Sequence, residues 1–468
     1  MSRINTNVVS LIAQRVLGRN QADLNQSLAR LSTGLRINTG KDDPAGMIAS
    51  ENLRAEQSGI RAAIENGSRA NNIIGTAEGG LNEVSALLTQ LQGLVTQTAN
   101  TGGLSQEEIA ANQLQVDSIL ATINRVAGST NFQGIQLLNG NYDYLTSGVV
   151  TSQIAALRVN QASIPDGASV NVVVNVLQSA QTGVLAYTGG TLGTGGATIL
   201  ISGTKGAQQL SFASGTTISQ ITAAINAVKA ATGLSAQVSG TAVRINSTDY
   251  GSKAFVSVTV VSGTFTMSGN KDFGRDAIVQ VNGAEATANG KDVSFRSSLL
   301  DLEFTIGNSI NITNGTSNFL ITGGGATFNL GSKVTENNKV SIGIGSMTTA
   351  NLGNANVGFL NSLGSGGENA MNSGSLVAAQ DILNAAIKQV SQLRGRLGAF
   401  QKFIVGSTVN NLGVALENAS AAESAIRDTD FAAETSALTR SQILTQAATT
   451  VLSQANSSPQ NVLALLRG

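Results

Sequence analysis

Apolar residues recur at helical spacing at both ends of the chain and alternate with polar residues in its middle. The seam nearest the N-terminus consists of Leu17, Leu24, Leu28, Leu31 and Leu35, spaced 7, 4, 3 and 4 residues apart. This spacing is typical of a helix that packs lengthwise against another helix. From about residue 165 to 350 the period is two, which predicts strands. We therefore expect an α+β multidomain fold: a long antiparallel helical rod or coiled coil from both chain ends, with an inserted β-rich outer region.

Turn residues mark the ends of the N-terminal helices. The run NTGKDDPAG interrupts the first seam: Gly40 suits a helix C-cap, Asp43 an N-cap and Pro44 the first position of a new helix. The apolar stripe that follows predicts a second helix reaching about Asn100. Its glycines weaken it, so this helix needs neighbours.

A third helix is expected after Ser105, which forms a capping box with Glu108. Short apolar runs follow and end at Asn139-Gly140, a preferred pair of tight hairpin turns. This pattern predicts a β-hairpin beyond the third helix.

The middle of the chain contains short runs with the alternation of strands. These runs are SVNVVVNV, ATILIS, AFVSVTVV, AIVQVNG, VSFRS, LEFTI and INIT. Tight turns are expected at Asn282-Gly283, Asn289-Gly290 and Asn314-Gly315. Residues 218–233 interrupt the strands with helical spacing.

Helical spacing returns near residue 376 and continues toward Leu416. A final helix is expected after the run RDTDFAAE, and Ser458 with Pro459 is expected to begin one last short turn. Most chain ends fray, yet this last turn is crowded with valine and leucine. A terminus this apolar needs a partner.

Composition excludes most catalytic chemistry. The chain has no histidine and no cysteine, so Ser-His-Asp and Cys-His catalysis and His/Cys metal sites are impossible, while a carboxylate-pair hydrolase stays open. The 28 basic and 28 acidic residues create no field that attracts nucleic acid or an anionic membrane. No run approaches the roughly 18 apolar residues of a membrane span. We expect a protein that is not an enzyme and has no catalytic, cofactor-binding or metal-binding residue.

The terminal segments are too thin to fold unaided. Each presents one apolar stripe, and ordering its backbone costs more than that stripe recovers. We expect these ends to become ordered when copies of the chain pack together.

Both ends also carry family signatures. The run LARLSTGLRINTGKDDPAG (28–46), with the opening RINTN, resembles the N-terminal signature of bacterial flagellins. The run SAIRDTDFAAETSALTRSQILTQAATTVLSQANSSPQNVLALL (424–466) resembles their C-terminal signature. The resemblance spans about residues 1–145 and 370–468, and the middle is similar to the variable outer part of flagellins.

The resemblance implies three domains. Residues 1–43 and 426–468 would form a terminal helical filament-core domain, and residues 44–164 and 351–425 a helical rod domain with a β-hairpin. Residues 165–350 would form the variable β-rich outer part.

The resemblance also implies a function. The chain would be exported by the flagellar secretion system and would self-polymerise into the extracellular bacterial flagellar filament, a helical homopolymer for swimming motility. Implied partners are other copies of the chain, flagellar cap and hook-associated proteins and an export chaperone, with no nucleic acid, membrane or cofactor.

Apolar residues of both ends would form the self-assembly interface. They are Val8, Leu11, Leu24, Leu28, Leu31, Leu35, Ile443, Leu444, Val451, Leu452, Val462, Leu463, Leu465 and Leu466.

The family also implies a surface that faces the flagellin-sensing Toll-like receptor. Here it comprises Gln90, Leu94, Gln97 and Gln115. Leu94 and Gln97 keep the family's residues, but Gln90 and Gln115 stand where strongly recognised members have Arg and Glu. Losing charged anchors weakens an interface, so recognition is expected to be poor.

Three alternatives stay open at this point. The leucine stripes also suit a helical bundle inside a monomer, because such spacing does not distinguish seams within one chain from seams between chains. A hook-filament junction protein has similar end helices. The β-rich middle could also add an adhesin or carbohydrate-binding domain to a filament subunit.

Overall fold

The computed structural model describes residues 6–100, 102–165, 168–354, 357–372 and 375–467, with residues 458–467 described by their backbone only. It divides into two compact units. Unit 1 comprises residues 1–68, 330–338 and 406–468, and unit 2 comprises residues 69–329 and 339–405.

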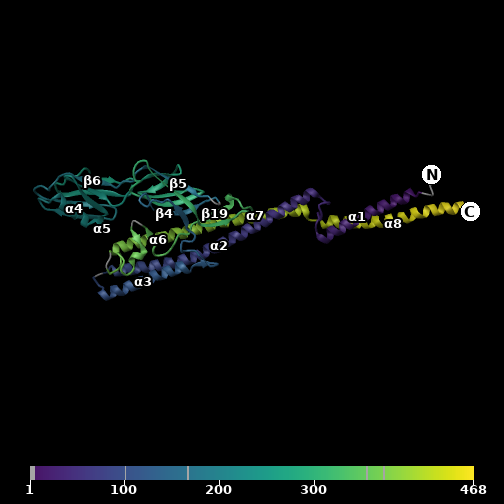
Figure 1. Cartoon of the computed structure of the whole chain (residues 1–468), viewed down its shortest axis with the longest axis horizontal. Coiled ribbons are helices and arrows are strands. Elements are labelled where there is room, and N and C mark those ends of the chain that lie inside the picture. The colour runs from purple at the N-terminus through teal and green to yellow at the C-terminus, as the bar shows by residue number, and fades with distance from the viewer. Residues whose placement is uncertain (1–5, 101, 166–167, 355–356, 373–374, 468) are drawn as a thin grey trace. The chain divides into compact units, whose positions relative to one another are not determined.

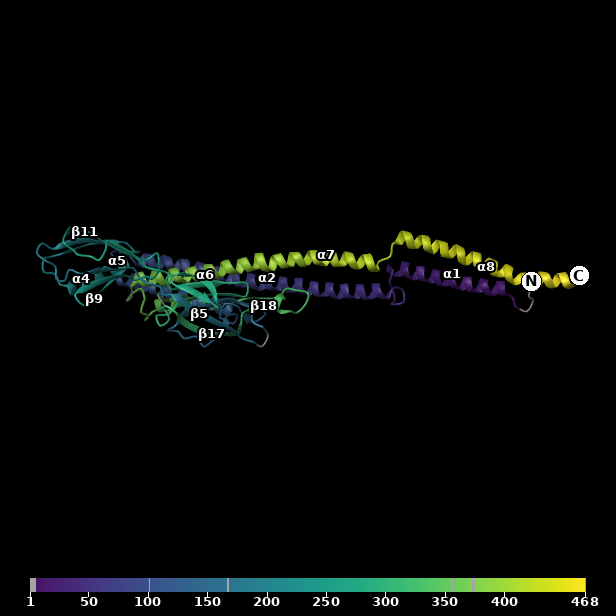
Figure 2. The same cartoon turned by 90° about the horizontal axis from the view of Figure 1, so that it is seen from above.

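Unit 1 is built from two pairs of helices. Its helices are α1 (Val8–Thr33), the first part of α2 (Pro44–Thr98), α7 (Ser407–Arg427) and α8 (Phe431–Arg467). Helix α1 lies alongside α8, and the first part of α2 lies alongside α7 (Figures 1 and 2). Bonds from Asn7 to Ala455 and from Asn20 to Leu444 show that α1 and α8 run antiparallel. The predicted antiparallel pairing of the two chain ends is confirmed.

The two helical pairs are interrupted at the same level. Leu35 forms an antiparallel bridge with Asp428, and the Arg36 amide donates to the Arg427 carbonyl at 2.7 Å. Helix α1 ends at Gly34, whose φ of 73° is left-handed and whose amide bonds to Arg30 at 2.8 Å. The C-cap prediction at Gly40 is therefore wrong. The earlier glycine takes the left-handed position and the chain leaves the helix there.

The predicted start of α2 is confirmed. Pro44 is its first residue, and the Asp43 carboxylate accepts from the Gly46 amide at 2.9 Å. Proline fits this position because the first helical amides have no partner inside the helix.

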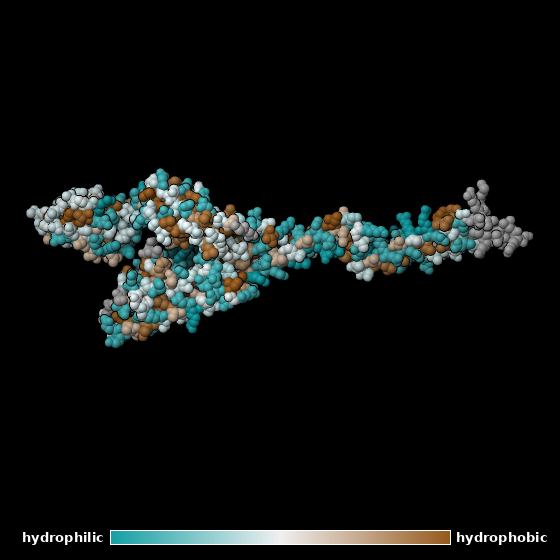
Figure 3. Space-filling model, viewed as in Figure 1, coloured by the Kyte–Doolittle hydropathy of each residue, from teal (hydrophilic) through white to brown (hydrophobic). Residues whose placement is uncertain are grey.

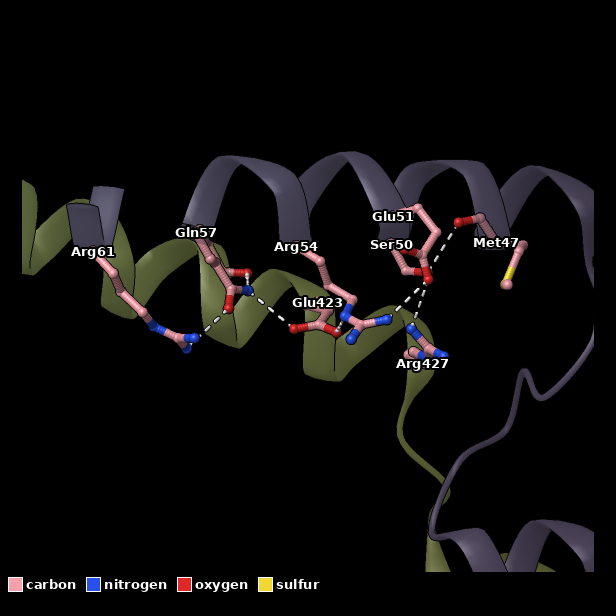
Figure 4. A network of polar contacts seen from close by, with 9 residues as sticks. Met47, Ser50, Glu51, Arg54, Gln57, Arg61, Glu423 and Arg427 are labelled. Atoms are coloured by element: carbon pink, nitrogen blue, oxygen red, sulfur yellow. Dashed lines mark hydrogen bonds and ion pairs between the residues drawn. The ribbon is translucent and has the colours of Figure 1, made fainter. Parts of the chain in front are cut away.

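Polar side chains join α2 to α7 beside the interruption (Figure 4). Glu51 accepts from Arg54 at 3.0 Å and from Arg427 at 3.1 Å. Gln57 donates to Glu423 at 3.0 Å. The Arg427–Glu51 and Gln57–Glu423 contacts cross between the helices and help to set their lengthwise register, whereas Arg54 and Glu51 both belong to α2.

Unit 2 contains three long helical segments. They are the rest of α2, α3 (Gln106–Ser129) and α6 (Leu376–Ala399), which continues into a π-helical turn (Phe400–Gly406). The capping box of Ser105 and Glu108 is present as predicted. The predicted α2 stripe is buried at Leu81, Val84, Leu88, Leu91 and Val95. Two 3₁₀ turns, Glu336–Asn338 in unit 1 and Leu360–Leu363 in unit 2, complete the described helical elements outside the β-rich part.

An antiparallel eight-stranded sheet forms most of the β structure of unit 2. Its order is β3 (Tyr144–Ser147), β17 (Gly315–Gly324), β5 (Val170–Gln178), β13 (Ile278–Val281), β14 (Ala284–Asn289), β15 (Asp292–Arg296), β16 (Leu300–Ile306) and β4 (Ile154–Ala162). Strand β16 alternates buried and half-buried residues, so one face covers a core. Strands β3 and β4 precede residue 165, where the period of apolar residues changes in the sequence.

Two smaller sheets and a helix share a second core. Their orders are β12 (Lys271–Phe273), β11 (Phe255–Gly263), β7 (Ala197–Ser202), β8 (Ala207–Phe212), and β6 (Val184–Tyr187), β10 (Ala242–Ser247), β9 (Leu234–Ser239). The helical segment predicted at 218–233 forms α4 (Ile218–Ala227) and α5 (Lys229–Thr232). Tyr187 stacks on Phe265 at 4.1 Å in this core.

Three two-stranded pairs complete the described strands. They are β1 (Asn131–Phe132) with β2 (Ile135–Gln136), β18 (Ala326–Asn329) with β19 (Lys339–Ile342), and β20 (Gly353–Asn354) with β21 (Gly358–Phe359).

Three local predictions fail. The predicted hairpin turns at Gln133-Gly134, where both residues have positive φ, and not at Asn139-Gly140. The run INIT forms turns and no strand; these turns end at Asn314, whose φ is 61°, and β17 begins at the next residue. Helix α8 continues through Pro459, so no separate last turn begins there, although proline inside a helix removes one backbone hydrogen bond.

Candidate self-association surface

The contact between α1 and α8 is lined mainly by small side chains. On α1 the inward positions are Ser10, Ala13, Leu17, Asn20, Leu24, Ser27 and Leu31; on α8 they are Ser441, Thr445, Ala448, Leu452 and Ala455. These positions are buried or half-buried and follow a regular alternation of three and four residues. Such a seam lets the helices approach closely but buries little apolar area.

Polar contacts hold this seam in register. The Ser10 hydroxyl donates to the Asn456 side-chain oxygen at 2.7 Å, and Arg30 lies 3.5 Å from Glu434. Ion pairs near the surface contribute at most about 1 kcal/mol. The contacts specify alignment more than they stabilise the pair.

Many of the larger aliphatic side chains of both helices point away from the seam, although Leu17, Leu24, Leu31 and Leu452 lie in it. Those that are largely exposed are Val8, Val9, Leu11, Ile12, Val16, Leu28, Ile443, Leu444 and Val451, with exposed fractions between 44% and 63%. Figure 3 shows brown apolar patches on the surface of these helices. These exposed apolar side chains make the surface of the helical pair a candidate interaction site.

A groove runs along α8 beside Leu24. It has a volume of about 770 Å³ and is lined by Leu24, Gln442, Thr445, Gln446, Thr449, Thr450 and Ser453. Its hydroxyl and amide groups are uncharged, so an approaching helix would not have to desolvate a charge.

The predicted interface residues fall into three groups. Val8, Leu11, Leu28, Ile443, Leu444 and Val451 are exposed, whereas Leu24, Leu31, Leu35 and Leu452 are half-buried. Val462, Leu463, Leu465 and Leu466 lie in the last turns of α8, and their side chains fall outside the described part of the structure.

Val9, Ile12 and Val16 complete the exposed apolar face of α1, although leucine spacing did not identify them as interface residues. The small residues Ser10 and Ala13 could have indicated in the sequence that Val9, Ile12 and Val16 face outward. When small residues occupy the inward positions, the bulky residues beside them face outward.

Within the described ranges, no cluster of three acidic, histidine or cysteine residues could hold a metal ion. None of the described helices is long and apolar enough to cross a membrane.

The candidate receptor-facing residues lie on unit 2. Gln90, Leu94 and Gln97 share one face of α2 and Gln115 lies on α3; the three glutamines are exposed and Leu94 is half-buried.

Both helical ends match models of one protein family. Residues 4–143 match the bacterial flagellin N-terminal helical region, and residues 380–466 match the bacterial flagellin C-terminal helical region. The chain thus has the helical ends of a filament-forming structural protein around an inserted β-rich region.

Relatives cover the chain from end to end. It is 31% identical to flagellin of Salmonella muenchen and 30% identical to B-type flagellin of Pseudomonas aeruginosa, with 99% of each chain covered. A solved structure of FliC from Burkholderia pseudomallei is 16% identical, spanning 71% of this chain and 99% of that one, at a TM-score of 0.25, too low to compare folds. The chain belongs to the bacterial flagellin family.

Family membership defines the general function. The protein is a structural subunit of the extracellular bacterial flagellar filament and is not an enzyme. The full-length matches do not favour the hook-filament junction protein or an added adhesin domain.

Proposed function

We propose that this flagellin polymerises through the outward apolar faces of α1 and α8, with copies of the same chain covering them. The observation that carries the proposal is the packing of the helical pair: small residues fill most inward positions, apart from Leu17, Leu24, Leu31 and Leu452, while most of the other bulky aliphatic residues lie outside. A packed helical pair normally places its bulky residues in its own seam. In this protein most of the described bulky aliphatic residues of α1 and α8 are exposed, so another molecule can cover them.

A second copy is the occupant that the chain's own chemistry fits. The exposed face is apolar and the molecule has equal numbers of acidic and basic residues, so copies repel one another little. If the face of one copy meets a different face of the next, the contact does not close on itself and generates a helical fibre.

The same surface suggests roles for the three domains. Residues 1–43 and 426–468 would form the filament core, and residues 44–164 and 351–425 the surrounding rod. Residues 165–350 would face the outside. The β3 and β4 strands belong to the same sheet as strands of this outer segment, so the outer module would include them.

Other partners would use the same apolar residues at different stages. An export chaperone would cover the end of α8 before the chain is exported through the flagellar secretion system. Flagellar cap and hook-associated proteins would meet the helical ends at the tips of the filament. The exposed Gln90 and Gln115 support weak recognition by the Toll-like receptor, because neither supplies a charge.

Two deletions test this assignment of parts. The first replaces residues 143–343 by a short linker, because Tyr142 and Ile344 already form an antiparallel bridge and can be joined without strain. The second removes residues 457–468. We expect seeded filaments from the first chain and none from the second, as seen by electron microscopy. Failure of the first despite folded helices, or filaments from the second, would contradict the proposal.

A further inference from the structure

A cavity of about 280 Å³ lies within unit 2, remote in sequence from the paired terminal helices. Its walls come from β4, from the loops around 343–347 and 351–354, and from α6. The charged residues that line it are Asp143, Arg158 and Arg396. Two guanidinium groups and one carboxyl group therefore share one small space.

The two arginines lack carboxylate partners. In the described ranges, neither Arg158 nor Arg396 has an acidic oxygen within 4.0 Å. Arg158 donates to the Gly353 carbonyl at 3.2 Å, and Arg396 donates to the Asn160 side-chain oxygen. The buried Arg396 Nε has no hydrogen-bond partner among these residues. A buried guanidinium nitrogen without an acceptor is costly.

The electrostatics of the cavity favour an added negative charge. Burial lowers the pKa of Arg158 and the neighbouring Arg396 lowers it further, while Glu303 and Asp143 oppose this change. Burial also lowers the pKa of Arg396, while Glu303 and Asp301 oppose that change. An arginine side chain stays protonated despite such shifts, so the two positive charges persist and repel one another.

The acidic groups nearby act on this pair without forming an ion pair with it among the described residues. Asp301 and Glu303 already lie 3.7 and 3.4 Å from Arg296. Burial raises the pKa of Asp143, and its Oδ1 accepts from the Tyr144 amide at 2.8 Å. Arg158 and Arg396 oppose this rise in the Asp143 pKa, so Asp143 is one carboxyl group shared by two guanidinium groups.

We propose that this cavity binds a small oxyanion, a carboxylate or a phosphate, between the guanidinium groups of Arg158 and Arg396. Guanidinium groups present forked donors that match the oxygens of both anions. The side chains of Ser346 and Gln392 also line the cavity and carry further hydrogen-bonding groups. The volume lies just below the usual range for small-molecule pockets, so a sugar acid fits as well as inorganic phosphate.

The backbone beside the cavity is also unusual. Ala156 in β4 has a φ of 49°, a left-handed value that costs a non-glycine residue about 1 to 3 kcal/mol. Strained residues of this kind gather at ligand clamps. The strained backbone at Ala156 and the arginines without carboxylate partners both support a ligand site in this cavity, without identifying the ligand.

Titration calorimetry on the full chain tests the proposal. Glucuronate and sodium phosphate are titrated separately, with sodium chloride at equal ionic strength as the control for screening. We expect saturable binding of at least one oxyanion and none of chloride. Binding of glucuronate alone identifies a carboxylate site, and binding of phosphate alone identifies a phosphate site. No saturable binding of either overturns the proposal, whatever the variants do.

Variants locate the site. Arg158→Gln and Arg396→Gln are each expected to weaken binding about tenfold or more, since each removes one charge-assisted contact. Arg158→Lys keeps the charge and loses the fork, so it should bind more weakly than the unaltered chain but better than Arg158→Gln. Arg244→Gln is the matched control, because Arg244 is exposed on β10. Equal binding by both glutamine variants and the control would place the anion elsewhere and contradict the assignment.

Discussion

Ile443→Ala separates the assembly surface from the stability of the single chain. Ile443 is 63% exposed on α8. Complete burial of an isoleucine side chain is worth about 1.5 to 3 kcal/mol, so covering the exposed part is worth about 1 to 2 kcal/mol. Alanine retains a small share, which leaves a loss of about 1 to 1.5 kcal/mol per subunit contact. The concentration of free subunit at equilibrium with filaments should rise about five- to twelvefold.

The assay is seeded polymerisation followed by sedimentation and measurement of the subunit left in solution. Thermal unfolding of the unpolymerised chain should change little, because alanine is a slightly better helix former than isoleucine. Ile312→Ala is the matched control: it makes the same chemical change at a side chain that is 57% exposed in unit 2. An unchanged free concentration for Ile443→Ala, or an equal rise for both variants, would refute the reasoning.

Two further predictions concern helix α2 and the Asp42 carboxylate that precedes it. The Cβ that Gly59→Ala adds would meet the Ser332 carbonyl oxygen, so this variant should speed amide exchange in residues 330–338. The Cβ that Gly75→Ala adds would meet nothing within 4 Å. This second variant should therefore stabilise α2 by roughly 0.5 to 1 kcal/mol in thermal unfolding. Hydrogen bonding by the Thr39 amide is the main cause that lowers the pKa of Asp42. The stability that Asp42 adds is therefore present above its unfolded pKa of about 3.9 and lost as pH falls through the folded value. The Thr39 amide resonance should report this loss in an NMR titration, and Asp42→Asn should abolish the pH-dependent shift of that resonance. Equal amide exchange in both glycine variants would contradict the first prediction. A Thr39 titration that survives Asp42→Asn would contradict the second.

The positions of the helices could be predicted from short-range signals. Pro44 after Asp43, and Ser105 before Glu108, fix helix starts through bonds between near neighbours, so the sequence alone contains them. The strand from Ala197 to Ser202 was also predicted, because its apolar content and alternation are local.

Strand neighbours could not be predicted in the same way. Strand β5 pairs with β13 and β17, which lie far along the chain. Periodicity shows which face of a strand is buried but not which strand lies beside it. The position of the hairpin turn was also predicted wrongly. The turn falls at Gln133-Gly134, which adopts the positive φ angles that are expected of an Asn-Gly pair such as Asn139-Gly140.

The candidate surface was predicted only in part. Leucine spacing identified residues near the seam, but the inward positions belong largely to serine, threonine and alanine, which periodicity scales rank as neutral. The cavity between Arg158 and Arg396 was missed altogether. These arginines lie on β4 and α6, and nothing in the local sequence around either one indicates the other.

Hydrogen exchange by mass spectrometry tests most directly whether the terminal helices depend on other copies of the chain. The measurement compares residues 8–33 and 431–457 in the isolated subunit and in filaments, with α3 (106–129) as the internal reference. Because the α1–α8 seam buries mainly small residues, we predict exchange in these helices to slow about a hundredfold or more on polymerisation, while α3 changes little. Exchange that is already as slow in the isolated subunit as in the filament would contradict the account.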